Sequence, residues 1–168
     1  MKKIGIGYEN YKEFIDQNLY YVDKTLLVRD ILEKGGKVTL LTRPRRFGKT
    51  LGLSMLRTFF ELEYDRDGRA IDKRRYFEGM KVMECGDEVL REMGRYPVIK
   101  LSLKEAKQPD FDSSFLALRR EINSEFSRHG YLSDSENLTD DDKIVLSGFM
   151  RGEVSWMERE RSEATAPF

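Results

Sequence analysis

The 168 residues include 30 lysines and arginines and 30 aspartates and glutamates, so the formal net charge is zero. A protein that coats nucleic acid usually has a basic excess, and this balance argues against that class. Hydrophobic residues make up 39% of the chain, which is enough for one globular domain with a core and too many for a disordered chain.

The sequence shows no sign of secretion or of membrane insertion. The N-terminal Met-Lys-Lys-Ile-Gly-Ile-Gly lacks the apolar core of a signal peptide, and no run approaches the roughly 18 apolar residues of a membrane span. The single cysteine, Cys85, excludes an intramolecular disulfide and a cysteine cluster for a metal. We therefore expect a cytoplasmic protein.

Two helices and a strand are expected in the first quarter of the chain. A short helix is predicted over residues 11–16. A second helix begins at Asp23 or Thr25, either of which can cap it, and runs to about Glu33 before a pair of glycines. The short apolar run at 38–41, bounded by glycines and a proline, predicts a buried strand.

The next helix is the best-patterned element of the sequence. Its phenylalanines are predicted to lie in the core, and five residues share one face: Gly52, Met55, Leu56, Phe59 and Phe60. Charges and Gly68 interrupt any pattern over residues 64–75, which predicts a loop, and residues 89–93 are expected to be helical.

Strand and helix alternate again in the second half. Residues 97–103 alternate apolar and polar side chains, which predicts a strand. A helix over residues 111–126 carries an apolar stripe whose phenylalanines are also predicted to be core: Phe111, Phe115, Leu118, Ile122 and Phe126. A capping box at Thr139–Asp142 begins a last helix, which reaches Met150.

The segment between the strand at 38–41 and the patterned helix reads Arg-Pro-Arg-Arg-Phe-Gly-Lys-Thr, over residues 43–50. A strand, a tight loop that ends in Gly-Lys-Thr, and a helix together hold the phosphates of a nucleoside triphosphate. One element of the Walker A pattern G-x-x-x-x-G-K-[ST] is missing, because Arg43 occupies the position of the first glycine.

Each part of this loop has a chemical role in a phosphate site. Gly48 lets the backbone approach phosphate oxygens, Lys49 would bridge the β- and γ-phosphates, and Thr50 would place its hydroxyl on Mg²⁺. We therefore predict ATP and Mg²⁺ as ligands and Thr50 as the metal-binding residue. The predicted nucleotide-binding residues are Arg45, Arg46, Phe47, Gly48, Lys49, Thr50 and Leu51.

Two boxes, Tyr-Tyr-Val-Asp-Lys-Thr at 20–25 and Leu-Leu-Thr-Arg-Pro-Arg-Arg-Phe-Gly-Lys-Thr at 40–50, resemble the bacterial predicted AAA-ATPase-like family. Its members carry Y-x-D-K-T and R-P-R-R-F-G-K-[ST], and their next strand is similar to residues 96–103. The resemblance covers residues 4–150 and implies that Arg43 is the family's own version of the loop. It also implies a role near the nucleotide for Asp23, Lys24 and Thr25.

Hydrolysis would require a carboxylate at the end of a second apolar strand, where it holds Mg²⁺ through water and orients the attacking water. Residues 144–146 are apolar but precede Ser147, and the strand at 97–103 has only Glu105 beyond it. Neither is four apolar residues followed by an acid, so we expect this chain to bind ATP weakly and to hydrolyse it poorly or not at all. In the resembling family this Walker B strand lies further along, and a PD-(D/E)XK nuclease-like domain often follows it.

We therefore expect the N-terminal part of such an ATPase, as a natural truncation, a frameshifted product or a cut piece. The predicted fold is α/β: a P-loop NTPase-like three-layer parallel sheet flanked by helices, ending before the Walker B strand. Residues 1–150 would form the domain and residues 151–168 an atypical, frayed tail.

Two further expectations concern partners. An incomplete sheet leaves an unpaired edge, which predicts self-association. The alternative function is a non-catalytic interaction module whose basic loop binds an anionic partner such as nucleic acid. Steep salt dependence without nucleotide specificity would favour that alternative.

Overall fold

A computed structural model describes residues 2–42, 44 and 47–152 of the chain. Contacts between residues divide the chain into two compact units, Met1–Val98 and Ile99–Phe168, and each unit is described by itself. The predicted tail, apart from its first two residues, lies outside the described part.

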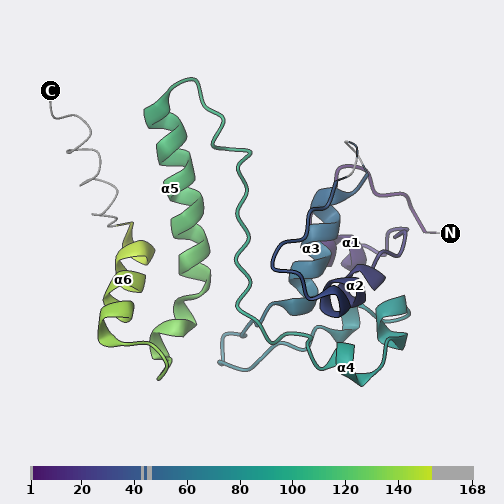
Figure 1. The fold of residues 1–168 in the computed structure, drawn as a ribbon. Coiled ribbons are helices and arrows are strands. Elements are labelled where there is room, and N and C mark those ends of the chain that lie inside the picture. The colour runs from purple at the N-terminus through teal and green to yellow at the C-terminus, as the bar shows by residue number, and fades with distance from the viewer. Residues whose placement is uncertain (1, 43, 45–46, 153–168) are drawn as a thin grey trace, which may run out of the picture. The chain divides into compact units, whose positions relative to one another are not determined.

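Helices and loops make up the described part of the first unit (Figure 1). The elements in chain order are α1 (Tyr11–Asp16), α2 (Leu26–Lys34), α3 (Lys49–Phe60), the 3-10 helices η1 (Arg74–Tyr76) and η2 (Lys81–Glu84), and α4 (Asp87–Leu90). The three helices predicted before residue 61 are thereby confirmed, and α4 overlaps the helix expected near residue 89.

Local capping explains where these helices begin and end. The Asn10 side chain accepts hydrogen bonds from the first turn of α1, including the Lys12 N–H at 3.0 Å. Gly35 has the left-handed conformation that ends α2, as its sequence position predicts. Gly48, also left-handed, precedes α3.

A core of aromatic and aliphatic side chains holds the first unit together. The Phe77 ring contacts the rings of Tyr11 and Phe59, and the ring centroids are 5.4 Å apart in both pairs. Phe59 meets Phe77 edge to face, a favoured arrangement of aromatic rings. Further buried members come from α2, α3 and the segments after residue 75: Val28, Met55, Tyr76, Val82 and Val89.

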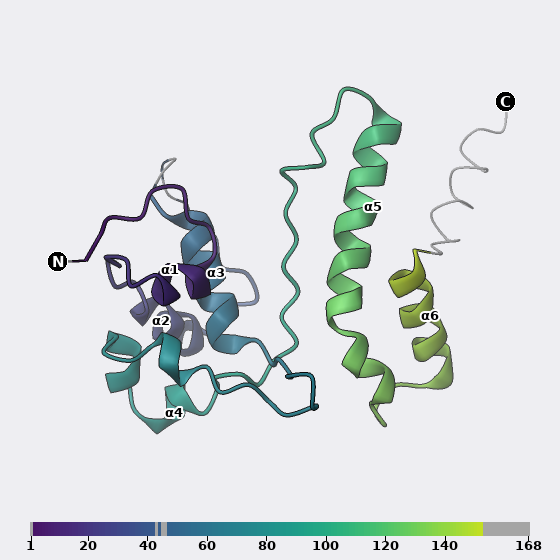
Figure 2. The ribbon, with the colours of Figure 1, turned by 180° about the vertical axis from the view of Figure 1, so that it is seen from behind.

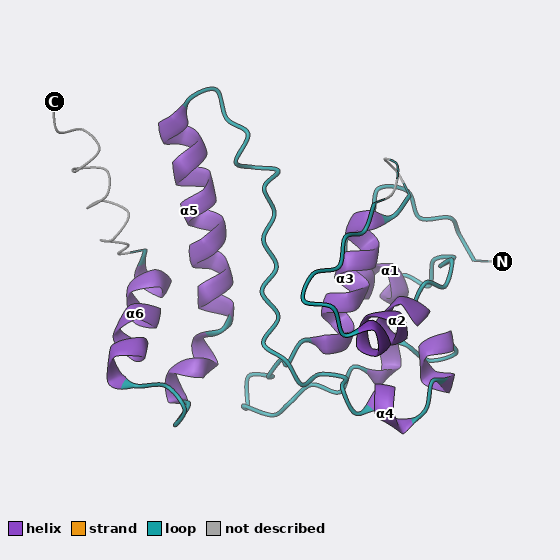
Figure 3. Cartoon of the chain, viewed as in Figure 1, coloured by secondary structure: helices purple, strands orange, loops and turns teal. Residues whose placement is uncertain are grey.

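The predicted parallel sheet is wrong for the described residues, which contain helices and loops but no strand (Figure 3). Only isolated bridges occur among them, one pairing Glu61 with Tyr96 and one pairing Tyr64 with Ala70. Residues 38–41, expected as a buried strand, are not in a strand, and the Val38 side chain is 87% exposed. A strand needs a hydrogen-bonded neighbour, and no described segment pairs with this run.

Residues 97–103 were also expected as a strand and are not one. Helix α5 (Phe111–Arg128) supplies acceptors that replace a neighbouring strand within the second unit. The Lys100 N–H donates to Glu125 Oε1 at 2.8 Å, and the Ser102 N–H donates to Glu121 Oε1 at 2.9 Å. The predicted self-association relied on a sheet edge that the described residues do not form, and self-association itself stays a prediction.

The second unit is built on α5 and α6 (Asp140–Arg151), which lie side by side and are joined through η3 (Gly130–Asp134) (Figure 2). The rings of Phe126 and Phe149 stack between the two helices, with centroids 4.2 Å apart and planes 7° apart. Both helices were predicted from the sequence and are confirmed.

The start of α6 has the predicted capping box. Thr139 Oγ accepts the Asp142 N–H at 3.2 Å, and the Asp142 carboxylate accepts the Thr139 N–H at 3.0 Å.

The core prediction is wrong for Phe111, whose side chain is 71% exposed at the first position of α5. It stacks on Phe115 one turn later, which covers one face of its ring only.

None of the helices in the described part of the chain combines the length and the apolar composition that crossing a membrane requires.

Candidate functional site

The predicted phosphate loop enters α3 through a sharp turn at Gly48. This residue has φ 70° and ψ 30°, a conformation that glycine adopts at little cost and other residues rarely adopt. Its carbonyl accepts the Gly52 N–H at 2.8 Å, so the helix is regular from its first turn. The positive end of α3 therefore lies directly after the Gly48 turn.

Two cavities of the first unit border this turn. The larger, of about 820 Å³, is lined by the N-terminal segment 5–9, by Phe14 and by residues 48–51. The smaller, of about 170 Å³, is bounded mainly by α2 and the loop: Lys24, Leu27, Asp30, Leu41, Phe47, Gly48, Lys49 and Gly52. Gly48 and Lys49 thus lie on the walls of both.

The cavities bring together the predicted nucleotide-binding residues that the structure describes. Gly48 and Lys49 line both cavities, Phe47 the smaller one, and Thr50 and Leu51 the larger one. The remaining loop residues, Arg43, Arg45 and Arg46, lie outside the described residues.

Sequence reasoning missed the contribution of residues 5–9 to the larger cavity. Gly5 fits closely there, because a Cβ atom would come within 2.7 Å of the Leu19 and Phe14 side chains and one of them would have to shift. Tyr8 packs edge to face on Phe14 with ring centroids 5.7 Å apart, and Glu9 adds a carboxylate to the lining. The closely spaced Gly5 and Gly7 were the one sequence signal of this segment.

The Asp-Lys-Thr part of the upstream box has a defined structural role. Asp23 Oδ1 accepts hydrogen bonds from both the N–H and the hydroxyl of Thr25, at 2.8 and 2.7 Å. Across the unit, Asp23 Oδ2 accepts the Lys81 N–H at 2.8 Å, and the buried Thr25 hydroxyl accepts the Val82 N–H at 3.1 Å. These bonds attach the start of α2 to η2.

The hydrogen bonds at Asp23 also set its charge state. Burial acts to raise its pKa, but the donors Lys81 N–H and Thr25 outweigh burial and hold the pKa below its usual value. Asp23 is therefore a carboxylate at neutral pH and accepts all three bonds.

Lys24 lies between these two anchors and contacts the loop. Its Nζ donates to the Phe47 carbonyl at 3.2 Å. A Cβ atom at Gly48 would lie 3.4 Å from the same Nζ, so the lysine also packs closely against the turn. The middle residue of the upstream box thus contacts the predicted phosphate loop at Phe47, whereas Asp23 and Thr25 bind η2.

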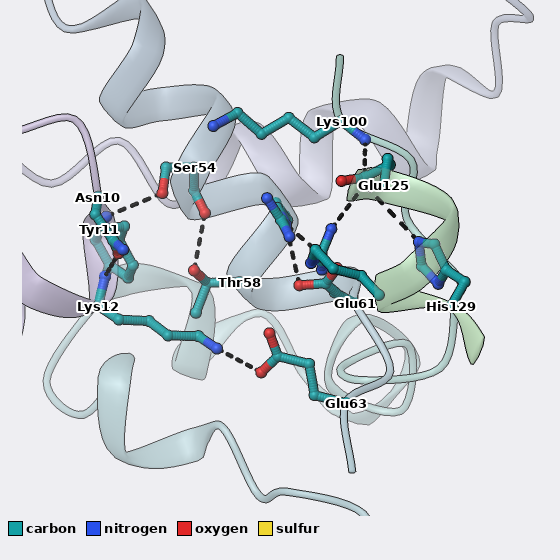
Figure 4. Close-up of polar contacts among 12 residues, drawn as sticks. Asn10, Tyr11, Lys12, Ser54, Thr58, Glu61, Glu63, Lys100, Glu125 and His129 are labelled. Atoms are coloured by element: carbon teal, nitrogen blue, oxygen red, sulfur yellow. Dashed lines mark hydrogen bonds and ion pairs between the residues drawn. The ribbon is translucent and has the colours of Figure 1, made fainter. Parts of the chain in front are cut away.

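A second polar cluster lies at the other end of α3, among residues that the sequence analysis did not single out. The Lys73 ammonium is buried, donates to the Glu61 carbonyl and lies 3.1 Å from the Glu63 carboxylate. Lys12 from α1 pairs with Glu63 as well (Figure 4), and Arg57 pairs with the Glu61 carboxylate at 3.1 Å. Three cations thus surround two carboxylates.

The pKa values of the two carboxylates in this cluster are shifted in opposite directions. Burial, together with hydrogen bonding to Glu63, raises the pKa of Glu61 to about 7 in spite of Arg57. Burial also opposes ionisation of Glu63, but the bonds from Lys12 and Glu61 and the charge of Lys73 lower its pKa to about 2. The pair therefore shares one proton through mildly acidic pH.

This arrangement predicts a pH dependence of stability. The folded-state pKa of Glu61 exceeds its ordinary value of 4.5, so the folded protein binds the proton more tightly and its stability falls as pH rises from 4.5 to about 7. Glu61→Gln mimics the protonated form and is expected to remove this fall, a gain of roughly 3 kcal/mol at pH 8 and little at pH 4.5. Urea unfolding of both proteins across this range measures it. Parallel pH profiles would contradict the assignment.

Candidates for a hydrolytic carboxylate do not lie on strands. Residues 144–146 belong to α6, and Glu105 lies in a turn after residue 103. Among the described residues, no group of three or more histidine, cysteine, aspartate or glutamate side chains is placed to hold a metal ion.

The comparisons with known proteins identify the family. A family model described as Predicted AAA-ATPase matches residues 5–159, which is most of the chain, and the chain therefore belongs to this family. The searches of curated proteins and of solved structures found no match. The family inferred from the two sequence boxes is thereby confirmed, and membership of the chain in this family is consistent with nucleotide binding.

Proposed function

We propose that this chain binds ATP together with Mg²⁺ at the Gly48 turn. The proposal rests on the left-handed Gly48, which directly precedes the N-terminus of α3, and on the cavity of about 820 Å³ that residues 48–51 help to line. Helix N-termini attract phosphate through their amide groups and the helix dipole. A volume of this size is within the range of small-molecule sites.

The cavity lining suits both ends of a nucleotide. The phosphates would lie at Gly48 and Lys49, where the ammonium neutralises their charge. The nucleoside would extend toward the N-terminal segment 5–9, where Tyr8 and Phe14 offer aromatic surface.

The position of Thr50 is suitable for a residue that binds Mg²⁺. It is the second residue of α3 and its side chain borders the larger cavity, beside Lys49. Mg²⁺ commonly keeps several waters and is bound by nucleotide phosphates and one or two protein oxygens. When bound, the ion would neutralise phosphate charge, and Thr50 would hold it through its hydroxyl.

The test is an equilibrium titration of the wild type and of Lys49→Ala with Mg²⁺-ATP. Loss of a charge-assisted contact predicts roughly 10- to 100-fold weaker binding for the variant. Lys34→Ala, which removes an exposed lysine at the end of α2, is the matched control for net charge and should bind as the wild type does.

Equal affinities of the wild type and Lys49→Ala would contradict the proposal. The anionic-partner alternative predicts a different pattern. ATP and an unrelated polyanion would then compete with similar affinity, and both would weaken steeply with added salt.

A further inference from the structure

We infer that Lys24 is a positioning residue of this site, an inference that rests on the proposed function. Its ammonium fixes the peptide between Phe47 and Gly48 so that the Gly48 N–H faces the bound phosphates. Lys24 acts through the backbone of the loop, in contrast to Lys49, which is proposed to meet the phosphates itself.

One hydrogen bond from Lys24 orients the peptide group between Phe47 and Gly48. The Lys24 Nζ donates to the Phe47 carbonyl at 3.2 Å. In a planar trans peptide the C=O and the following N–H point in opposite directions. The Gly48 N–H therefore points away from the Lys24 ammonium, and the carbonyl, which would repel a phosphate, is directed toward the lysine.

Both sequence neighbours of Lys24 are held in place by hydrogen bonds. Asp23 is bound to Thr25 and to the Lys81 N–H, and Thr25, fully buried, accepts the Val82 N–H. The lysine thus extends from a fixed backbone and can hold the loop in one place. Pre-organised donors bind anions better than mobile ones, because less ordering accompanies binding.

Lys24 also packs closely against the Gly48 turn. The Lys24 Nζ lies 3.4 Å from the position of a Cβ atom at Gly48, and both residues line the smaller cavity with Phe47. The residue type with the most backbone freedom is thus placed against the lysine that restricts it.

The experiment measures loop order and nucleotide affinity separately. In the nucleotide-free protein, ¹⁵N relaxation should give Gly48 an order parameter near the rigid value of about 0.85, and Lys24→Met should lower it toward about 0.6. Lys24→Arg, which keeps a cationic donor, should restore it, and Lys34→Met is the control. The melting temperature should not change, because Asp23 and Thr25 still attach α2 to η2.

Nucleotide titrations then distinguish positioning from direct phosphate contact. Lys24→Met should weaken ATP and ADP by the same factor, about 10-fold, because both use the Gly48 N–H. A larger loss for ATP than for ADP would show that Lys24 touches the γ-phosphate and would overturn the positioning role. An unchanged Gly48 order parameter would overturn it as well.

Failure of the proposed function gives a different result. If the wild type binds no ATP, the nucleotide site is refuted, while a fall of the Gly48 order parameter in Lys24→Met still supports the role of Lys24 in ordering the loop. If Lys24→Met does not fold, Lys24→Gln, which keeps an uncharged donor, replaces it with the same expected direction.

Discussion

Phe59→Ala is expected to lower the free energy of unfolding of the first unit by about 3–5 kcal/mol. Phe59 is completely buried, and its ring contacts both Phe60 and Phe77 edge to face, at 5.1 and 5.4 Å between centroids. Truncation removes these contacts and leaves a cavity between α3 and the segments after residue 75. Because 3–5 kcal/mol is a large part of the stability of a small unit, the variant should be largely unfolded at elevated temperature.

Urea unfolding followed by far-ultraviolet circular dichroism measures this effect. Leu53→Ala is the matched control, because Leu53 lies on the same helix with its side chain 49% exposed. It should lower the free energy of unfolding by less than about 1 kcal/mol. Equal losses for Phe59→Ala and Leu53→Ala would mean that α3 does not pack as described.

Lys73→Ala is expected to destabilise the first unit by a similar amount, about 3–5 kcal/mol, for an electrostatic reason. The Lys73 side chain is fully buried between the Glu61 carbonyl and the Glu63 carboxylate. Without the lysine, a buried acceptor and a partly buried carboxylate lose a donor, and Glu63 keeps only its pairing with Lys12 and its hydrogen bond with Glu61. The same urea experiment measures this loss.

Arg69→Ala is the control for removal of a cation from an ion pair. Arg69 and Asp67 are 3.6 Å apart, with side chains 79% and 71% exposed, so their pair contributes about 0–1 kcal/mol. If Lys73→Ala costs no more than Arg69→Ala, Lys73 cannot be buried as the structure places it.

The helices were predictable because their signals are local. The pattern of apolar residues in α3 and the cap of α6 at Thr139 depend on neighbours within one or two turns. The two strand predictions were wrong, because a strand depends on hydrogen-bonding partners that are distant in sequence. The N–H groups of Lys100 and Ser102 bind glutamates of α5, and alternation within residues 97–103 could not reveal that competition.

The candidate site shows the same division. Gly48, Lys49 and Thr50 follow from the loop sequence and lie at one turn of the structure. The contact between Lys24 and Phe47 joins residues 23 positions apart, and the sequence suggested only that the upstream box lies near the nucleotide.

No feature of the sequence indicated that Lys73 is buried. It falls in the charged stretch 64–75, which reads as a solvated loop, and its carboxylate partner Glu63 is ten residues away. Only the tertiary structure identifies it as part of the interior.

The most direct test of nucleotide binding is a titration of the ¹⁵N-labelled wild-type chain with Mg²⁺-ATP, followed amide by amide. The proposed site predicts saturable shifts centred on residues 47–51 and on Tyr8, with the largest at the Gly48 amide. Shifts confined to α5 and α6, or no saturable shift at residues 47–51, would contradict the account.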